Sequence, residues 1–309
     1  MTKQYVFPPQ NWAEVSRGML VSEEDILKEL ELGKIWYFYD TCALIHHSHR
    51  ECGEKVIQYI KKNNGIVVLL QTVVMELASQ QNNNRILEEH QDYIRKMMNN
   101  GIPVIFLPEE KCCTIIAAVM SLDRQGRNER FTYAVRHLRS GNSGVSRALD
   151  MLTDSERSRI LSGKPVSDEL GVRGIKVIRE KKQTRDSMGE EMIFYCMIML
   201  ASLLIPMVVL SDDKSAFDRF YRTGIYIEEH YQRKKMQYFS SVHLCHMMYQ
   251  QNIMKATEAE EFLKTVYGNT GMINFRGITA QDIMPEEQRV PIKDMVELIC
   301  EDKELRILI

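Results

Sequence analysis

Short apolar runs alternate with longer helix-like segments along much of the chain, and this alternation constrains the fold more than any other feature. The runs are rich in Val, Ile, Tyr and Phe, as buried strands are, and turn or helix-cap residues separate them. Strands that alternate with helices usually pair in parallel within one sheet, which predicts an α/β fold. The expected strands are residues 35 to 39, 66 to 70, 104 to 107, 207 to 211 and 225 to 227.

The composition fits a globular protein with a large core. The chain has 309 residues, of which 44% are apolar and 27% are charged, and its formal net charge is −2. Such a total charge produces no strong overall field toward nucleic acid or membranes. The seven cysteines show no C-x-x-C spacing, and the first ten residues lack a basic-then-apolar signal pattern. We therefore expect a reducing, cytoplasmic location.

One stretch, residues 192 to 210, has the length of a membrane span, because it contains 19 residues without a charge. However, Pro206 divides it into a helix-like piece and a short strand-like piece, and acidic residues flank it on both sides. A buried helix followed by a buried strand explains these residues better. We expect no membrane association.

The alternation is interrupted between the third and fourth strands by a basic segment. Between positions 124 and 185 there are 15 Lys and Arg against 7 Asp and Glu. We divide the chain into an N-terminal helical segment, an α/β domain that carries a mostly helical insertion, and a helical C-terminal extension. Their bounds are 1 to 33 for the N-terminal segment, 34 to 232 for the α/β domain (core 34 to 110 and 186 to 228, insertion 111 to 185) and 233 to 309 for the extension.

Acidic residues stand where the strands and helices would share one edge of the sheet. Asp40 directly follows the first strand, and Asp213 closely follows the fourth. Glu76 lies one turn into the helix after the second strand, and Glu190 and Glu191 open the apolar helix before the fourth. Right-handed βαβ units place strand ends and helix beginnings on one rim, so these carboxylates should gather there. Gathered carboxylates repel one another unless a cation holds them, which points to a divalent metal ion.

Several of these acids also have a purely structural explanation. Asp213 can cap the helix that follows it, and its neighbour Asp212 is a second candidate ligand. Ser187 and Glu190 fit a capping box, which would turn Glu190 back onto the backbone. Glu191 is therefore the preferred ligand from this helix, with Glu190 as the alternative.

Other polar residues near the acids invite further interpretations. Three histidines, at positions 46, 47 and 49, follow the first strand, but their spacing matches no closed zinc site. A basic run leads directly to the acidic pair at positions 190 and 191. Such a run is either a solvated face or a contact surface for the phosphate backbone of a nucleic acid. The candidate nucleic-acid contacts are Arg179, Lys181, Lys182 and Arg185.

The order of these motifs resembles that of the PIN-domain superfamily of metal-dependent ribonucleases, which includes many toxin nucleases. The resemblance covers about residues 34 to 110 and 186 to 228, so the insertion and the C-terminal extension lie outside it. It implies a PIN-like three-layer α/β/α core with a central parallel sheet. It also implies that one or two Mg²⁺ or Mn²⁺ ions bind to Asp40, Glu76, Glu191 or Glu190, and Asp213, with Thr41 and Ser211 as neighbouring hydroxyls.

On this basis we expect a Mg²⁺- or Mn²⁺-dependent endoribonuclease, a hydrolase that cleaves RNA phosphodiester bonds. Two hard cations about 4 Å apart can activate water and stabilise the leaving oxygen in such a reaction. A DNA structure-specific nuclease is the alternative among enzymes. The non-enzymatic alternative is a degenerate PIN domain that binds RNA or scaffolds an assembly, and Glu where the family more often has Asp before the fourth strand favours it. The insertion and the C-terminal helices are open to a protein partner, an inhibitor or a second copy of the chain.

Overall fold

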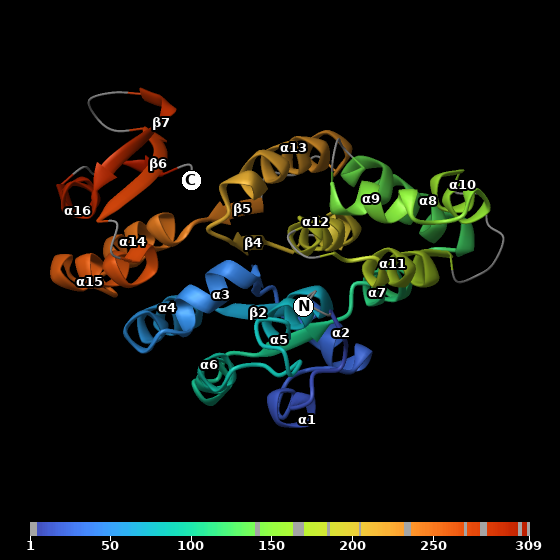
Figure 1. Cartoon of the computed structure of the whole chain (residues 1–309), viewed down its shortest axis with the longest axis horizontal. Helices are drawn as coiled ribbons and strands as arrows, with labels where there is room; N and C mark the ends of the chain where they lie inside the picture. The colour runs from blue at the N-terminus through green and yellow to red at the C-terminus, as the bar shows by residue number, and fades with distance from the viewer. Residues whose placement is uncertain are drawn as a thin grey trace.

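A five-stranded parallel sheet lies at the centre of the computed structural model, in the order β3-β2-β1-β4-β5 (Figure 1). Helices flank the sheet and form a three-layer α/β/α core, as the sequence predicts. The strands are β1 (Ile35–Tyr39), β2 (Gly65–Leu70), β3 (Val104–Leu107), β4 (Met207–Leu210) and β5 (Met236–Phe239). The structure describes residues 5–139, 143–162, 170–183, 186–203, 205–231, 236–268, 271–278, 283–301 and 305–307.

The four strands β1 to β4 coincide with the predicted apolar runs to within one residue. Every residue of β2, β3 and β4 is buried, and β1 is buried from Trp36 onward. Burial on both faces is expected for parallel strands that helices cover on each side. The register places Phe38 of β1 between Val68 of β2 and Val209 of β4. The apolar runs therefore form the middle of the core.

The helices of the α/β core begin at the edge of the sheet where the strands end. The helix α3 follows β1 directly, α5 follows β2, and α13 follows β4 after a short loop, which brings their first turns together. Before β5, the helices outside the insertion are α1 (Trp12–Val15), α2 (Glu23–Glu31), α3 (Thr41–Ser48), α4 (Arg50–Lys62), α5 (Gln71–Ala78), α6 (Glu88–Asn99), α12 (Met188–Leu200) and α13 (Lys214–Tyr231).

The insertion between β3 and β4 is helical, as predicted, and lies at one end of the molecule (Figure 1). Residues 144 to 162 form two consecutive helices. A capping box separates them, since Thr153 N donates to Glu156 Oε2 at 2.9 Å and Glu156 N donates to Thr153 Oγ1 at 3.3 Å. The insertion helices are α7 (Lys111–Met120), α8 (Arg124–Leu138), α9 (Gly144–Asp150), α10 (Asp154–Ser162) and α11 (Leu170–Glu180).

The predicted fifth strand, residues 225 to 227, is wrong, because these residues belong to α13. Tyr226 and Ile227 are buried, and the Tyr226 ring lies 4.6 Å from the ring of His137 on α8. Packing against the insertion therefore overrides the strand propensity of an Ile-Tyr-Ile run. The fifth strand is β5, which pairs with β4, so the α/β core continues beyond residue 228.

The C-terminal extension is only partly helical. Two helices, α14 (Ser241–Gln250) and α15 (Ala256–Tyr267), lead into a three-stranded antiparallel sheet in the order β7-β6-β8. This sheet lies at the end of the molecule opposite the insertion (Figure 1). Its elements are β6 (Met272–Ile278), β7 (Ile283–Pro291) and β8 (Arg306–Ile307), with α16 (Ile292–Glu301) after β7.

Candidate functional site

Asp40 and Asp213 lie at the topological switch point of the sheet. The strand β1 has β2 on one side and β4 on the other, and α/β proteins bind ligands in the crevice at the ends of such strands. Asp40 follows β1 and is 5% exposed. Ser211, directly after β4, donates from Oγ to Asp40 Oδ2 at 2.8 Å and accepts from Asp213 N at 3.1 Å. This hydroxyl thus links acidic residues that follow two different strands.

Glu76 reaches the same place from α5. Its Oε2 accepts a hydrogen bond from the hydroxyl of Thr41, the residue after Asp40, and its Oε1 lies 2.7 Å from Lys182 Nζ. The helix α12 approaches this carboxylate closely, because a Cβ atom on Gly189 would lie 2.6 Å from Glu76 Oε1. A glycine at the start of α12 therefore allows this helix to begin beside Glu76.

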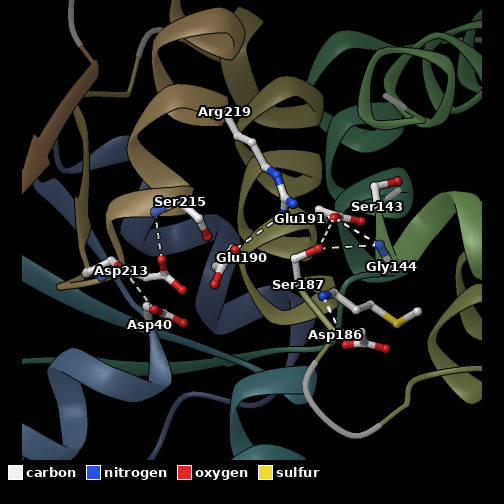
Figure 2. A network of polar contacts seen from close by, with 12 residues as sticks. Asp40, Ser143, Gly144, Asp186, Ser187, Glu190, Glu191, Asp213, Ser215 and Arg219 are labelled. Carbon is white, nitrogen blue, oxygen red and sulfur yellow. Dashed lines mark hydrogen bonds and ion pairs between the residues drawn. The ribbon is translucent and has the colours of Figure 1, made fainter. Parts of the chain in front are cut away.

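Glu190 completes the group from the first turn of α12 (Figure 2). Its carboxyl group hydrogen-bonds to Asp213. Burial, this hydrogen bond and the negative charges of Asp40 and Asp213 raise the pKa of Glu190 to about 10, against the opposing effect of Arg219. Burial opposes the charge of Asp213, but hydrogen bonds from Glu190 and Ser215 keep the pKa of Asp213 low. The two carboxyl groups therefore share one proton, which resides on Glu190.

Glu191, the preferred ligand on sequence grounds, has a different set of partners. Its carboxylate accepts hydrogen bonds from the backbone N–H groups of Gly144 and Val145, at 3.1 and 2.7 Å, and from the hydroxyl of Ser187 at 2.5 Å. Arg219 Nη1 lies 2.9 Å away. Figure 2 shows Glu191 directed toward the start of α9, whereas Glu190 is directed toward Asp40 and Asp213. Glu191 therefore holds the insertion against α12.

The predicted capping box at Ser187 is absent, because the Ser187 side chain makes no cap hydrogen bond and instead donates to Glu191. Glu190 is thereby available to the acidic group. The structure brings together Asp40, Glu76, Glu190 and Asp213.

The charge of this acidic group is balanced by protein atoms. Burial and the neighbouring charge of Glu76 raise the pKa of Asp40 to about 6, although hydrogen bonds from Cys42 and Ser211 favour its ionised form. Glu76 pairs with Lys182, and Arg219 Nη1 lies 3.4 Å from Glu190 Oε2. Among the residues that the structure describes, no three Asp, Glu, His or Cys side chains already form a metal-binding arrangement. Lys182 and Arg219 therefore supply positive charge to this acidic group.

Asp212, the second candidate beside Asp213, is engaged in a separate network. It accepts hydrogen bonds from the backbone N–H and hydroxyl of Ser241 at 2.6 and 2.7 Å, and His46 Nδ1 lies 2.7 Å away. His47 Nε2 lies 3.0 Å from the same hydroxyl. These contacts join α3 to the start of α14. Asp212 and two of the three histidines thus have structural partners.

Two of the four predicted nucleic-acid contacts are buried in ion pairs. The Arg179 side chain is 7% exposed and contacts Glu109 and Glu110. The Lys182 side chain is 1% exposed and pairs with Glu76 and Asp186. Lys181 is partly exposed, and Arg185 lies outside the described residues. The basic run therefore serves largely to hold the insertion on the core.

Three residues of the site are not apparent from the motifs. Cys42 donates from Sγ to Asp40 Oδ2 at 2.9 Å, Asp186 pairs with Lys182, and Arg219 bridges Glu190 and Glu191. Cys42 is two residues from Asp40, a proximity that could have indicated its place. The contacts of Asp186 and Arg219 depend on how the chain packs after the insertion, and the spacing of residues along the sequence does not show this.

The comparisons with known proteins do not assign the chain to a family: no family model, curated protein or solved structure matches it. Across the part of the chain that the structure describes, every helix is too short or too polar to traverse a bilayer.

Proposed function

We propose that this protein is a Mg²⁺- or Mn²⁺-dependent nuclease that hydrolyses phosphodiester bonds, with RNA as its substrate. The observation that carries the proposal is the meeting of Asp40, Glu76, Glu190 and Asp213 at the switch point of the sheet. These residues come from four separate segments of the chain. Asp40 is buried and the other three are partly buried, and bringing neighbouring carboxylates out of water costs free energy.

The donor set fits a hard divalent cation, which prefers carboxylate oxygens. Asp40, Glu190 and Asp213 would hold it, since Figure 2 shows Glu190 directed toward the two aspartates. When bound, the cation would activate water and neutralise charge on the phosphodiester. Ser211 orients Asp40, and Thr41 orients Glu76, so both hydroxyls act as positioning groups.

RNA, rather than DNA, is proposed because the motif order resembles that of metal-dependent ribonucleases. A specific observation favours a second candidate, a catalytically inactive RNA-binding or scaffold protein. Lys182 and Arg219 already pair with two of the four acids, as they would in a site that needs no metal. The cytoplasmic location belongs to the proposal as well, and the seven cysteines, all of them free thiols, are consistent with it.

Cleavage assays on the purified full-length protein test the proposal. The parent protein should cut single-stranded RNA in Mg²⁺ or Mn²⁺ and should be inactive in EDTA. The Asp40→Asn and Asp213→Asn variants should lose more than about 100-fold in rate, since loss of an outer-shell partner alone costs about 10- to 100-fold. The matched control is Asp218→Asn, an exposed carboxylate one turn further along α13, which should cut as the parent does.

Parallel reactions with single-stranded DNA and DNA flaps separate the two nuclease alternatives. Preferential cleavage of DNA would show that the substrate is DNA and not RNA. An Asp40→Asn protein as active as the parent would refute the proposal that the acidic group is the active site. RNA binding without cleavage, and without Mn²⁺ binding that depends on Asp40, would favour the scaffold.

A further inference from the structure

Lys182 is a buried cation placed beside the acidic group. Its side chain is 1% exposed, and its ammonium lies 2.7 Å from Glu76 Oε1 and 2.7 Å from Asp186 Oδ1. The ring of Tyr5 covers another side of the ammonium, with its centroid 4.8 Å away. A lysine in these surroundings cannot leave one carboxylate without stranding a buried charge. Its position is therefore set by the fold.

The contacts of Asp186 fix the ammonium further. Asp186 Oδ2 accepts from the backbone N–H of Gln183 at 2.6 Å, and Oδ1 accepts from the backbone N–H of Met188 at 3.1 Å. Met188 is the first residue of α12, and Lys182 follows the end of α11. Asp186 is thus anchored at the beginning of the same helix that carries Glu190. The ammonium is held between this anchor and Glu76.

Both oxygens of Glu76 are engaged by protein donors. Oε1 faces Lys182 and Oε2 accepts from Thr41, while the tight approach of Gly189 limits movement of the carboxylate. A metal ion on Glu76 would have to sit about 2 Å from one of these oxygens, as Mg²⁺ does, and would meet the ammonium or the hydroxyl. By contrast, Figure 2 shows Glu190 directed toward Asp40 and Asp213, and the Ser211 hydroxyl contacts both of these aspartates.

We propose that the Lys182 ammonium is a built-in cation that takes the place of a second metal ion at Glu76. This inference rests on the proposed function. The centre then holds one divalent ion, on Asp40, Glu190 and Asp213, and Glu76 is a partner of Lys182 rather than a metal ligand. Lys182 is in this sense a positioning residue, which supplies a permanent positive charge where two-metal nucleases bind a second ion about 4 Å from the first.

Metal stoichiometry tests this inference directly. Titration of the full-length protein with Mn²⁺ by calorimetry should give one site per chain. The Lys182→Gln variant should give two, and the second site should disappear in a variant that also carries Glu76→Gln. Electron paramagnetic resonance is a second readout, since two neighbouring Mn²⁺ ions couple and a single ion does not. The matched control is Arg179→Gln, which breaks a buried ion pair at α11 that does not involve Glu76 and should leave one site.

The outcomes separate this inference from the proposed function. Absence of Mn²⁺ binding in the parent protein would remove both. Two sites in the parent would overturn the role of Lys182 while the nuclease proposal stands, and so would a folded Lys182→Gln protein with one site. Should Lys182→Gln fail to fold, the Glu76→Gln variant decides alone. Its single site should persist, with Kd changed by no more than the roughly 10- to 100-fold that loss of an outer-shell partner costs, and loss of that site would show Glu76 to be a ligand.

Discussion

Replacement of Glu190 by glutamine should stabilise the metal-free protein at alkaline pH. The Glu190 side chain is 14% exposed, and its pKa is raised from 4.5 to about 10. A glutamine can still donate a hydrogen bond to Asp213, but it carries no proton to lose. The glutamine therefore imitates the protonated carboxyl group at every pH. It removes the free-energy cost that the folded protein pays above pH 4.5 to keep Glu190 protonated.

The sign follows from proton linkage. The folded chain keeps the Glu190 proton above pH 4.5, where the unfolded chain has released it, so this residue makes stability fall as pH rises from about 4.5 toward 10. At pH 7.5 the interval is about 3 pH units, or about 4 kcal/mol at about 1.4 kcal/mol per unit. The lowered pKa of Asp213 stabilises the folded protein and offsets part of this free-energy cost. We expect Glu190→Gln to gain about 2–3 kcal/mol at pH 7.5.

Urea unfolding in EDTA at pH 5 and pH 7.5 measures the difference. The two proteins should unfold almost together at pH 5 and separate at pH 7.5, with the variant the more stable. Mn²⁺ should reverse the order, because binding at 1,000 times Kd adds about 4.1 kcal/mol to the parent only. The matched control is Glu191→Gln, which weakens the hold on Gly144, Val145 and Arg219 and should lose stability at both pH values. A Glu190→Gln protein that is less stable than the parent at both would refute the reasoning.

Three further predictions concern neighbouring residues. Because the pKa of Asp40 is raised to about 6, Mn²⁺ affinity should fall as pH drops from 7 to 5, and a titration that is flat over this range would contradict its role as a ligand. Arg179→Ala should lose about 3–5 kcal/mol in urea unfolding, since it removes the counter-charge of Glu109, which is fully buried. A loss below about 1 kcal/mol would show that the pair is not structural. Gly189→Ala should lower the free energy of unfolding by about 1–3 kcal/mol and slow cleavage, because the new methyl group would displace Glu76. Calorimetric unfolding and a cleavage assay measure the two effects, and a variant that matches the parent in both would contradict this prediction.

The central strands and the rim of acids could be predicted because each depends on a few consecutive residues. The run from Ile35 to Tyr39 is apolar throughout because helices cover both faces of its strand. Asp40 follows it at the carboxyl end of the strand, which is the edge of the sheet where α/β proteins bind ligands. The order of the acids along the chain then places Glu76 and Asp213 on that edge. Local pattern and long-range topology agree here, so the sequence suffices.

The choice between Glu190 and Glu191 could not be made in this way. Neighbouring helical residues point about 100° apart, and α12 is apolar on nearly every side, so no amphipathic pattern shows which direction faces the sheet edge. The decision depends on where α9 docks, since Gly144 and Val145 engage Glu191. The strand expected at 225 to 227 failed for a related reason, because α8 offers Tyr226 a helical packing partner from a distant part of the chain.

Glu191 and Glu190 connect the insertion directly to the acidic group. Glu191 accepts a hydrogen bond from the first turn of α9, and Glu190 contacts Asp213. The guanidinium of Arg219 contacts both glutamates. A force or a ligand that pulls α9 from its seat would loosen Arg219 and twist the first turn of α12. A displacement of these peripheral helices would thus reach Glu190 and Asp213.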